Sequence, residues 1–351
     1  MFKQIAPTAQ DRPPAIRARL IGIYAFLIAA NVSVWLWALF ALRGHAVMLG
    51  SALLAYGFGL RHAVDADHIA AIDNVTRKLM QEGKRPVAVG FMFSLGHSTI
   101  VLLGSAAIAG TALALQNHLA VARNIGNIVG TLISGAFLLG IAIVNLAVFR
   151  SIYQAFVRVR RGEPYVEEDF DSLLAGRGFL ARLFRPLFRM IRDSWHMYPL
   201  GALFGLGFDT ATEVGVLAIS AAGASQGLSF WTILVFPALF AAGMLLVDTT
   251  DNILMLGAYG WAFVKPVRKL YYNLTVTCVS AIVALAVGGI EVLGLLAGYL
   301  HFKGWFWDAV AKLNGNLGTF GYFIIGLFVL SWIVSVALYK WRRFDDLGLN
   351  A

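Results

Sequence analysis

Residues 51–74 read SALLAYGFGLRHAVDADHIAAIDN, an apolar stretch long enough to cross a bilayer, yet with charged residues in its second half. A membrane core about 30 Å thick needs about 20 predominantly apolar residues in a helix. Ionisable side chains inside such a segment are costly unless they face a polar cavity or a partner. This stretch therefore predicts a transmembrane helix with a functional site within it.

Similar apolar runs recur along almost the whole chain. Of the 351 residues, 59% are hydrophobic and only 13% are charged, which excludes an ordinary soluble domain. We expect an all-α polytopic membrane protein with eight transmembrane helices, folded as one transmembrane domain over residues 1–351. The predicted spans, with boundaries accurate to a few residues, are 20–42, 51–74, 87–113, 126–149, 198–223, 231–258, 271–299 and 318–340.

The basic residues predict the orientation, because positive charge is retained on the cytoplasmic side of a membrane. If the N-terminus is cytoplasmic, the connections and termini on that side, counted with Lys340 at the end of the last span, carry 23 Lys and Arg, against 4 on the other side. Both termini and the long connection 150–197 are therefore predicted to be cytoplasmic. Part of that connection, RLFRPLFRMIRD, is predicted to be an amphipathic helix on the inner membrane surface. The net charge of +9 then needs no nucleic-acid partner.

Several kinds of chemistry are excluded by missing residues. The single cysteine, Cys278, lies in an apolar stretch, which excludes disulfides and thiolate metal clusters. The sequence has no GxxxxGK[ST] phosphate loop, so no ATP-binding unit is evident. Transport energy is expected from an ion gradient, the membrane potential or a separate protein.

Acidic residues are unusually frequent in the predicted spans. Eight of the 19 acidic residues fall within or at the ends of spans, whereas Arg61 is the one basic residue of 28 that lies inside a span rather than at its end. Arg61 can neutralise only one or two of them. A cation that passes through the protein would supply the missing positive charge.

Three candidate residues from different spans are predicted to lie at one depth. His62 is the twelfth residue of its span, His97 the eleventh and Asp209 the twelfth. This depth is close to the bilayer midplane, where transporters commonly bind substrate.

The motif RHAVDADHI at 61–69 holds the densest group of candidate ligands. In a straight helix His62, Asp65 and His68 share one side, whereas Asp67 points roughly 100° away from His68. Either the helix is distorted, which the glycines just upstream would permit, or Asp67 supports the ligands without binding the ion itself. Both alternatives remain open from the sequence.

Three further polar segments interrupt apolar spans: SLGHST at 94–99, GFDTATE at 207–213 and GMLLVDTTDN at 243–252. Each alone could be a packing motif or a helix cap, but together they indicate a lined pathway. Asp209 and Glu213 are four residues apart, and Asp248 and Asp251 are three apart, so a helix would place each pair on one face. The candidate metal-binding residues are His62, Asp65, Asp67, His68, His97, Asp209, Glu213, Asp248 and Asp251; no catalytic residue and no bound cofactor is predicted.

Imidazole and carboxylate groups without thiolate suit borderline divalent ions such as nickel, cobalt or zinc. Magnesium and calcium prefer shells made only of oxygen. These residue types do not choose among the three borderline ions.

Four motifs carry a resemblance to a known family: RHAVDADHI at 61–69, FSLGHSTIV at 93–101, LGFDTATEVGVL at 206–217 and GMLLVDTTDN at 243–252. In this order, and with a long central loop, they resemble the nickel/cobalt transporter family NiCoT, within it the HoxN-type high-affinity nickel permeases. The last motif ends in Asp-Asn where many members have Asp-Gly.

The resemblance implies inward transport of nickel, with cobalt as an alternative substrate, for metalloenzymes such as hydrogenase or urease. It implies that His62, Asp67 and His68 are essential, with Asp65 alongside. Matches in the other motifs are His97, Asp209, Thr210, Glu213, Asp248 and Asp251.

Two other functions remain open from the sequence. A proton-coupled carrier of an organic cation could use the same carboxylates and histidines as a proton relay. An intramembrane metalloenzyme could bind zinc with His and Asp, although the sequence has no HExxH motif.

A weak internal similarity accompanies these motifs. FGLRHAVDAD, which starts at Phe58, aligns with FGLGFDTATE, which starts at Phe204. The alignment places Asp67 opposite Glu213 and suggests a parallel repeat of four spans, although chance explains so short a match equally well.

Overall fold

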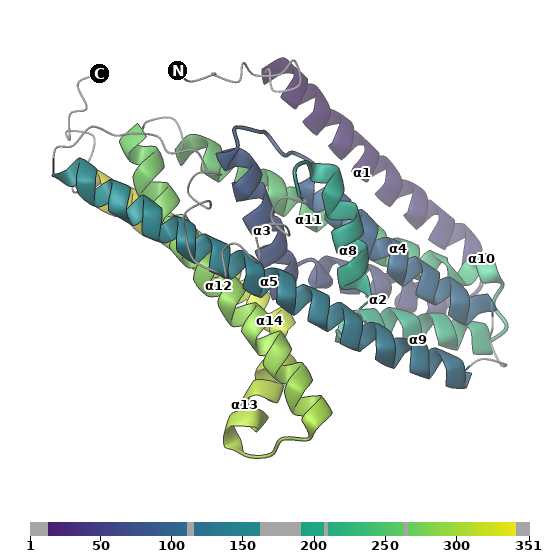
Figure 1. The fold of residues 1–351 in the computed structure, drawn as a ribbon. Helices are drawn as coiled ribbons and strands as arrows, with labels where there is room; N and C mark the ends of the chain where they lie inside the picture. Colours follow the sequence, from purple (N-terminus) through teal and green to yellow (C-terminus); the bar gives the residue numbers. More distant parts are fainter. Residues whose placement is uncertain (1–12, 111–115, 162–190, 207–209, 263–265, 342–351) are drawn as a thin grey trace. The chain divides into compact units, whose positions relative to one another are not determined.

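The computed structural model describes residues 13–110, 116–161, 191–206, 210–262 and 266–341. Within these ranges the chain is helical and contains no strand, which confirms the all-α prediction (Figure 1). The helices are α1 Pro13–Ala41, α2 Ala46–His62, α3 Ala66–Gln81, α4 Val89–Gly110, α5 Gln116–Arg160, the 3-10 turn η2 Ser194–His196, α8 Met197–Gly205, α9 Ala211–Ser225, α10 Phe230–Ile233, α11 Val235–Ala262, α12 Pro266–Leu300, α13 Trp305–Asn314 and α14 Leu317–Trp341.

The chain forms two compact units, each made from several separate segments. The first unit consists of Met1–Val64, Gly83–Ile133 and Asp193–Ile253. The second consists of Asp65–Glu82, Ser134–Arg192 and Leu254–Ala351. The amphipathic helix expected between residues 182 and 193 falls mostly outside the described residues.

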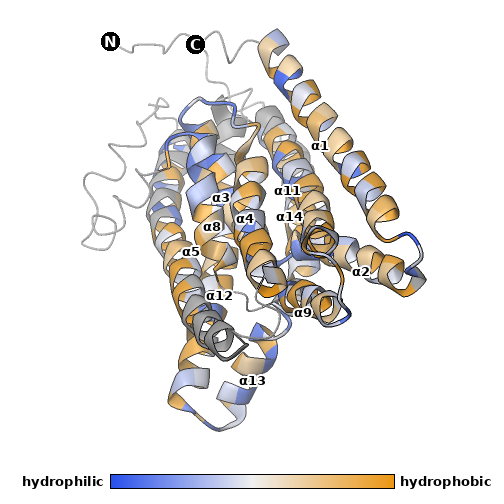
Figure 2. Ribbon diagram, turned by 90° about the vertical axis from the view of Figure 1, so that its right-hand side faces the viewer, coloured by the Kyte–Doolittle hydropathy of each residue, from blue (hydrophilic) through white to orange (hydrophobic). Residues whose placement is uncertain are grey.

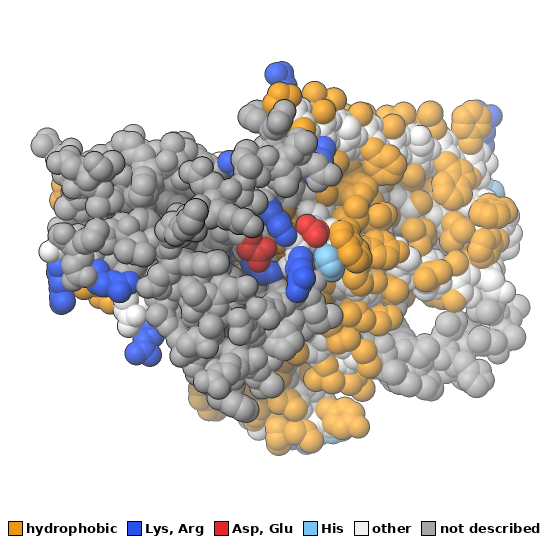
Figure 3. Space-filling model, turned by 45° about the horizontal axis from the view of Figure 1, so that its top comes forward, with side chains coloured by type: hydrophobic (Ala, Val, Ile, Leu, Met, Phe, Trp, Pro, Cys, Tyr) orange, Lys and Arg blue, Asp and Glu red, His pale blue; other side chains and the backbone are white. Residues whose placement is uncertain are grey.

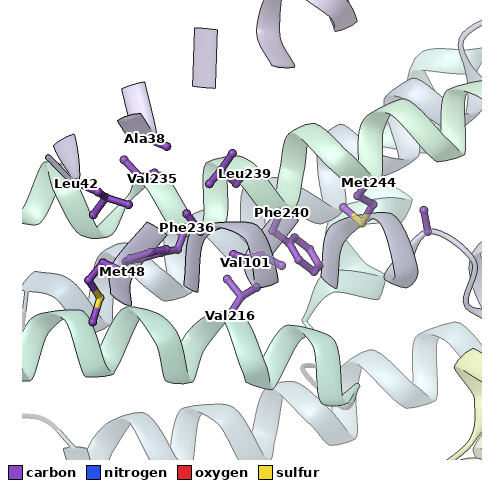
Figure 4. Close-up of a cluster of buried hydrophobic side chains, with 13 residues drawn as sticks. Ala38, Leu42, Met48, Val101, Val216, Val235, Phe236, Leu239, Phe240 and Met244 are labelled. Carbon is purple, nitrogen blue, oxygen red and sulfur yellow. The ribbon is translucent and has the colours of Figure 1, made fainter. Parts of the chain in front are cut away.

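An apolar core holds the first unit together (Figure 4). Phe236, Leu239 and Phe240 of α11 are fully buried at its centre. Val101 from α4 and Val216 from α9 contact them. The burial of these side chains fixes α11 against the helices that carry the candidate ligands.

The second unit is organised around α3. Helices α12 and α14 both pack against α3, and they also pack against each other (Figure 1). The short helix α13 lies between α12 and α14 in the chain and was not predicted from the sequence. Its Trp305 is 84% exposed, an exposure typical of an aromatic residue at a membrane interface.

Among the described residues, four helices are long and apolar enough to cross a membrane: Pro14–Ala41, Val89–Gly110, Phe230–Tyr259 and Thr277–Leu300. A fifth span results if the pair α2 and α3 counts as one. Large apolar side chains are exposed along these helices, and apolar colour covers wide areas of Figures 2 and 3. Lipid would cover such surfaces, whereas soluble proteins rarely expose apolar patches of this size to water. The described helices therefore support a multi-pass membrane protein.

The predicted span 51–74 is a broken helix. Helix α2 ends at His62 and α3 begins at Ala66, so residues 63–65 interrupt the span. The break occurs because Asp65 adopts an extended conformation, with φ −66° and ψ 147°. Basic residues end α2 and Asp67 occupies the first turn of α3, so both helix dipoles favour this division. The distorted-helix alternative is confirmed.

The aligned stretch in the other half of the chain is divided in a similar way. Helix α8 ends at Gly205 and α9 begins at Ala211, so the predicted span 198–223 also contains two helices. Helix α2 ends at His62, four residues after Phe58, whereas α8 ends at Gly205, one residue after Phe204. The internal repeat stays a prediction.

Close contact between α2 and α11 depends on Gly59. A Cβ atom at this position would lie 2.0 Å from the backbone oxygen of Phe240, whereas a Cβ at Gly57 would meet nothing within 4 Å. We expect Gly59→Ala to destabilise the protein by about 1–3 kcal/mol, because α2 must move away from α11.

Thermal unfolding in detergent would measure the effect, with Gly57→Ala as the matched control. Equal melting temperatures for the two variants would contradict the close packing of these helices.

Candidate metal site

Three helices of the first unit bring three ligand groups together. His62 is the last residue of α2, His97 lies within α4, and Glu213 lies in the first turn of α9. The Nε2 atoms of His62 and His97 are 3.0 Å apart, and Nε2 of His97 is 2.8 Å from Oε1 of Glu213. Nε2 of His62 is 3.8 Å from the same carboxylate oxygen. All three side chains are buried.

Glu213 is positioned by the start of its helix. Thr210 and Glu213 form a capping box, in which the Thr210 hydroxyl accepts a hydrogen bond from the Glu213 backbone N–H. The Thr210 hydroxyl also donates to Oε2 of Glu213 at 2.8 Å. One carboxylate oxygen is thus held by Thr210, which leaves Oε1 directed at His97.

His97 is positioned by the close approach of α4 and α8. A Cβ at Gly96 would lie 1.9 Å from the backbone oxygen of Tyr198, and a Cβ at Gly201 would lie 1.9 Å from that of Phe93. Small residues allow such short distances between helix backbones. The glycine beside His97 in SLGHST therefore serves packing, while the histidine itself faces the ligand group.

His62 is held from both sides of its ring. Its ring centroid lies 5.5 Å from that of Phe240 in α11. Its Nδ1 atom lies 3.3 Å from the Thr212 hydroxyl oxygen and 3.4 Å from that of Thr210. A hydroxyl that contacts Nδ1 fixes the ring orientation and leaves Nε2 for a ligand.

The arrangement of the three converging atoms fits binding of one shared cation better than hydrogen bonding among the three atoms. In a neutral imidazole, Nε2 is either a hydrogen-bond donor or an acceptor. No choice of these roles gives a hydrogen bond to every pair among the two Nε2 atoms and the carboxylate oxygen. Ligand atoms about 2.1 Å from one ion lie about 3.0 to 3.4 Å apart in right-angled to tetrahedral arrangements. The His62–His97 separation falls in this range, and the His97–Glu213 separation is slightly shorter.

His68 is a buried histidine of the second unit. It follows His62 by six residues, after the break between α2 and α3, and its side chain is 0% exposed. It stays a candidate ligand because it belongs to the motif RHAVDADHI.

The other predicted residues have different surroundings. Asp65 is the buried residue that precedes α3, and Asp67 is partly buried in the first turn of that helix. Asp248 accepts a hydrogen bond from Ser94, which lies one turn before His97 on α4. Asp251 is partly buried on α11. Asp209 lies outside the described residues.

Comparison with known proteins decides the family. The model of the NicO family, described as high-affinity nickel-transport protein, matches residues 48–338. The chain belongs to the NicO family. It is therefore a transporter and not an enzyme, and the expected resemblance to nickel/cobalt transporters is confirmed.

The relatives of this NicO chain include proteins named for both metals. A high-affinity nickel transport protein of Cupriavidus necator is 60% identical over the full length of both chains. The hydrogenase nickel incorporation protein HupN of Bradyrhizobium diazoefficiens is 49% identical over 95% of this chain and 86% of its own. The cobalt transport protein NhlF of Rhodococcus rhodochrous is 40% identical over 81% of each chain. No solved structure matches the chain.

Sequence reasoning missed two buried basic residues of this NicO protein. The span 51–74 was predicted to end at Asn74, but α3 continues to Gln81. Arg77 and Lys78, predicted to lie in a cytoplasmic connection, are 2% and 5% exposed. Positive charge inside the protein is thus not limited to Arg61 and a passing ion.

Proposed function

We propose that this protein carries Ni²⁺, and less readily Co²⁺, inward across the cytoplasmic membrane through a site made by His62, His97 and Glu213 with His68. The observation that carries the proposal is the convergence of two imidazole nitrogens and a carboxylate oxygen within 3.8 Å. These ligand types suit borderline divalent ions. The metal is cargo in this proposal, and no resident cofactor takes part.

The remaining candidates are proposed to act along the route of the ion. Asp65 and Asp67 lie within the motif RHAVDADHI, and Asp248, Asp251 and Asp209 lie in the other polar segments. Their carboxylates would attract a hydrated cation before imidazoles replace part of its water. The relative named for hydrogenase nickel incorporation supports a role in supplying nickel to metalloenzymes such as hydrogenase or urease.

Reconstitution offers the direct test. Purified protein in liposomes should take up labelled nickel at trace concentration, and cobalt should compete. A large excess of magnesium should not compete, because magnesium keeps its water and gains little from nitrogen ligands. Inhibition by magnesium would indicate a site made of oxygen alone, and metal-independent transport of an organic cation would support the proton-relay alternative.

We also propose eight spans in one transmembrane domain, with both termini and the 150–197 connection in the cytoplasm. The charge distribution of 23 against 4 basic residues supports this orientation. Each of the eight predicted spans overlaps a helix or a pair of helices.

Cysteine labelling would check this topology in a Cys278→Ala background. We expect Ser225→Cys, at the exposed end of α9, to react with a membrane-impermeant thiol reagent applied to intact cells. Ser172→Cys should react only after the cells are opened. Labelling of Ser172→Cys from outside would reverse the proposed orientation.

A further inference from the structure

A second buried polar group lies in the second unit. Its centre is Asp73 on α3, which is 0% exposed. The Tyr259 hydroxyl of α11 donates to one carboxylate oxygen of Asp73, and the Ser280 hydroxyl of α12 donates to the other at 2.6 Å. Both oxygens are thus bonded to protein donors, so this group is not arranged as a metal site.

Arg77 balances the charge of Asp73 from one turn further along α3. Its guanidinium donates from Nη1 to the Thr277 hydroxyl at 2.8 Å and from Nη2 to the side-chain oxygen of Asn74 at 3.0 Å. Asn145 of α5 donates to that same Asn74 oxygen. The network is one carboxylate and one guanidinium inside a shell of neutral hydroxyls and amides.

Other ionisable groups on the neighbouring helices are distant along the chain or differently bonded. Glu291 lies about three turns beyond Ser280 on α12 and accepts a hydrogen bond from Ser134. Cys278, between Thr277 and Ser280, is partly exposed. Helix α14, which also packs on α3, has no ionisable residue between Tyr322 and Tyr339. Within the described part of the chain, Tyr259 and Arg77 are the titratable groups that act on Asp73.

A buried carboxylate with a buried guanidinium one helix turn away is weak grounds for a purely structural role. Replacement of such a pair by apolar residues of similar size is often neutral or stabilising, so its presence points to specificity or switching. The hydroxyls of Tyr259 and Ser280 can each donate or accept a hydrogen bond. The shell can therefore satisfy Asp73 either as a carboxylate or as a carboxylic acid.

We propose that Asp73 is the proton-binding site that couples nickel transport to the proton gradient. One proton from the outer solution converts the carboxylate to the acid, and one proton is released to the cytoplasm later in the cycle. Arg77 keeps its charge throughout, so the network changes between neutral and singly positive. The inference rests on the proposed nickel transport and assigns its energy source, which the sequence leaves open because it has no nucleotide-binding motif.

The helix that carries Asp73 also carries His68. The two residues are five positions apart on α3, a rise of about 7.5 Å along the helix axis. A change in the hydrogen bonds between Asp73 and the adjoining helices can shift α3 as a unit, and His68 would shift with it. This connection gives the proton a physical means of acting on His68, a candidate ligand on the same helix.

Proteoliposomes with the membrane potential held at zero would test the proposal. Each unit of pH difference, acid outside, should raise the wild-type nickel accumulation ratio about tenfold for one coupled proton. Asp73→Asn should still exchange labelled nickel down its gradient but lose this response. Asp73→Glu, which keeps an ionisable carboxylate, should recover it in part. Glu291→Gln is the matched control, a buried carboxylate of the same unit, and should respond as the wild type does.

Two results would overturn the proposal: wild-type accumulation that ignores the pH difference, or Asp73→Asn accumulation that responds like the wild type. If Asp73→Asn does not fold, Ser280→Ala removes one donor and keeps the carboxylate. It should move the half-maximal response to a higher external pH, because a carboxylate with fewer donors holds its proton more readily; an unchanged response counts against the proposal. Failure of the wild type to exchange nickel at all would instead contradict the proposed function.

Discussion

His62→Ala and His97→Ala should each lower nickel uptake at trace concentration by at least about 100-fold. Loss even of groups that only support a ligand costs about 10- to 100-fold in metal affinity, and loss of a ligand should cost more. The two Nε2 atoms face each other at 3.0 Å, so either substitution leaves a single imidazole beside Glu213 at this point. An ion that gives up water at the site would then find too few nitrogen ligands.

Initial rates of labelled nickel uptake by cells, corrected for the amount of protein in the membrane, would measure this effect. His45→Ala is the matched control, because His45 precedes the first residue of the same helix α2 and is exposed. It should transport nickel normally. Uptake within about twofold of wild type by either His62→Ala or His97→Ala would exclude these residues as ligands.

The His62–His97 pair was predictable because both residues occupy the middle of apolar spans. Depth within a span can be counted from sequence, and residues of equal depth can meet wherever their helices are adjacent. The orientation of the two rings was not predictable, since it depends on Phe240 and on the Thr212 hydroxyl. Those contacts come from distant parts of the chain, and no local pattern encodes them.

A capping pattern in the sequence marks the start of α9 at Ala211, but the hydropathy of the segment predicted one continuous span. Thr210 and Glu213 form the S/T-x-x-E pattern of a capping box, which marks the beginning of a helix. Treating 198–223 as one span instead suggested that Asp209 and Glu213 share a helix face. That spacing argument does not hold across a helix start, and the capping pattern would have corrected it.

The end of α3 was the least predictable boundary. By composition and hydropathy, the segment after Asn74 resembles a solvated connection between spans, because it contains Arg77, Lys78 and Gln81. The structure buries Arg77 because Thr277 and Asn74 accept its hydrogen bonds. It buries Lys78, which donates to the backbone oxygen of Ile191. Polar partners from remote segments determined the outcome, and a single sequence does not reveal such partners.

Glu213→Gln should lower nickel uptake about as severely as loss of a histidine, while the protein keeps its fold. Gln can replace Glu in a capping box, so the start of α9 should persist. The substitution removes the negative charge 2.8 Å from His97 and 3.8 Å from His62. A neutral amide oxygen compensates a divalent cation far less well than a carboxylate inside a protein that excludes water.

Thr210→Ala separates the two roles of this helix start. It removes the hydroxyl that caps α9, at a cost of about 1 kcal/mol, but it keeps the carboxylate. We expect a lower melting temperature and a smaller loss of uptake from Thr210→Ala, because its hydroxyl supports the ligands without binding the ion. From Glu213→Gln we expect a near-normal melting temperature with little uptake. Glu291→Gln, a buried carboxylate in the second unit, should retain uptake. If Glu213→Gln transports nickel normally, Glu213 serves only to cap α9, and the ion must find its negative ligand elsewhere.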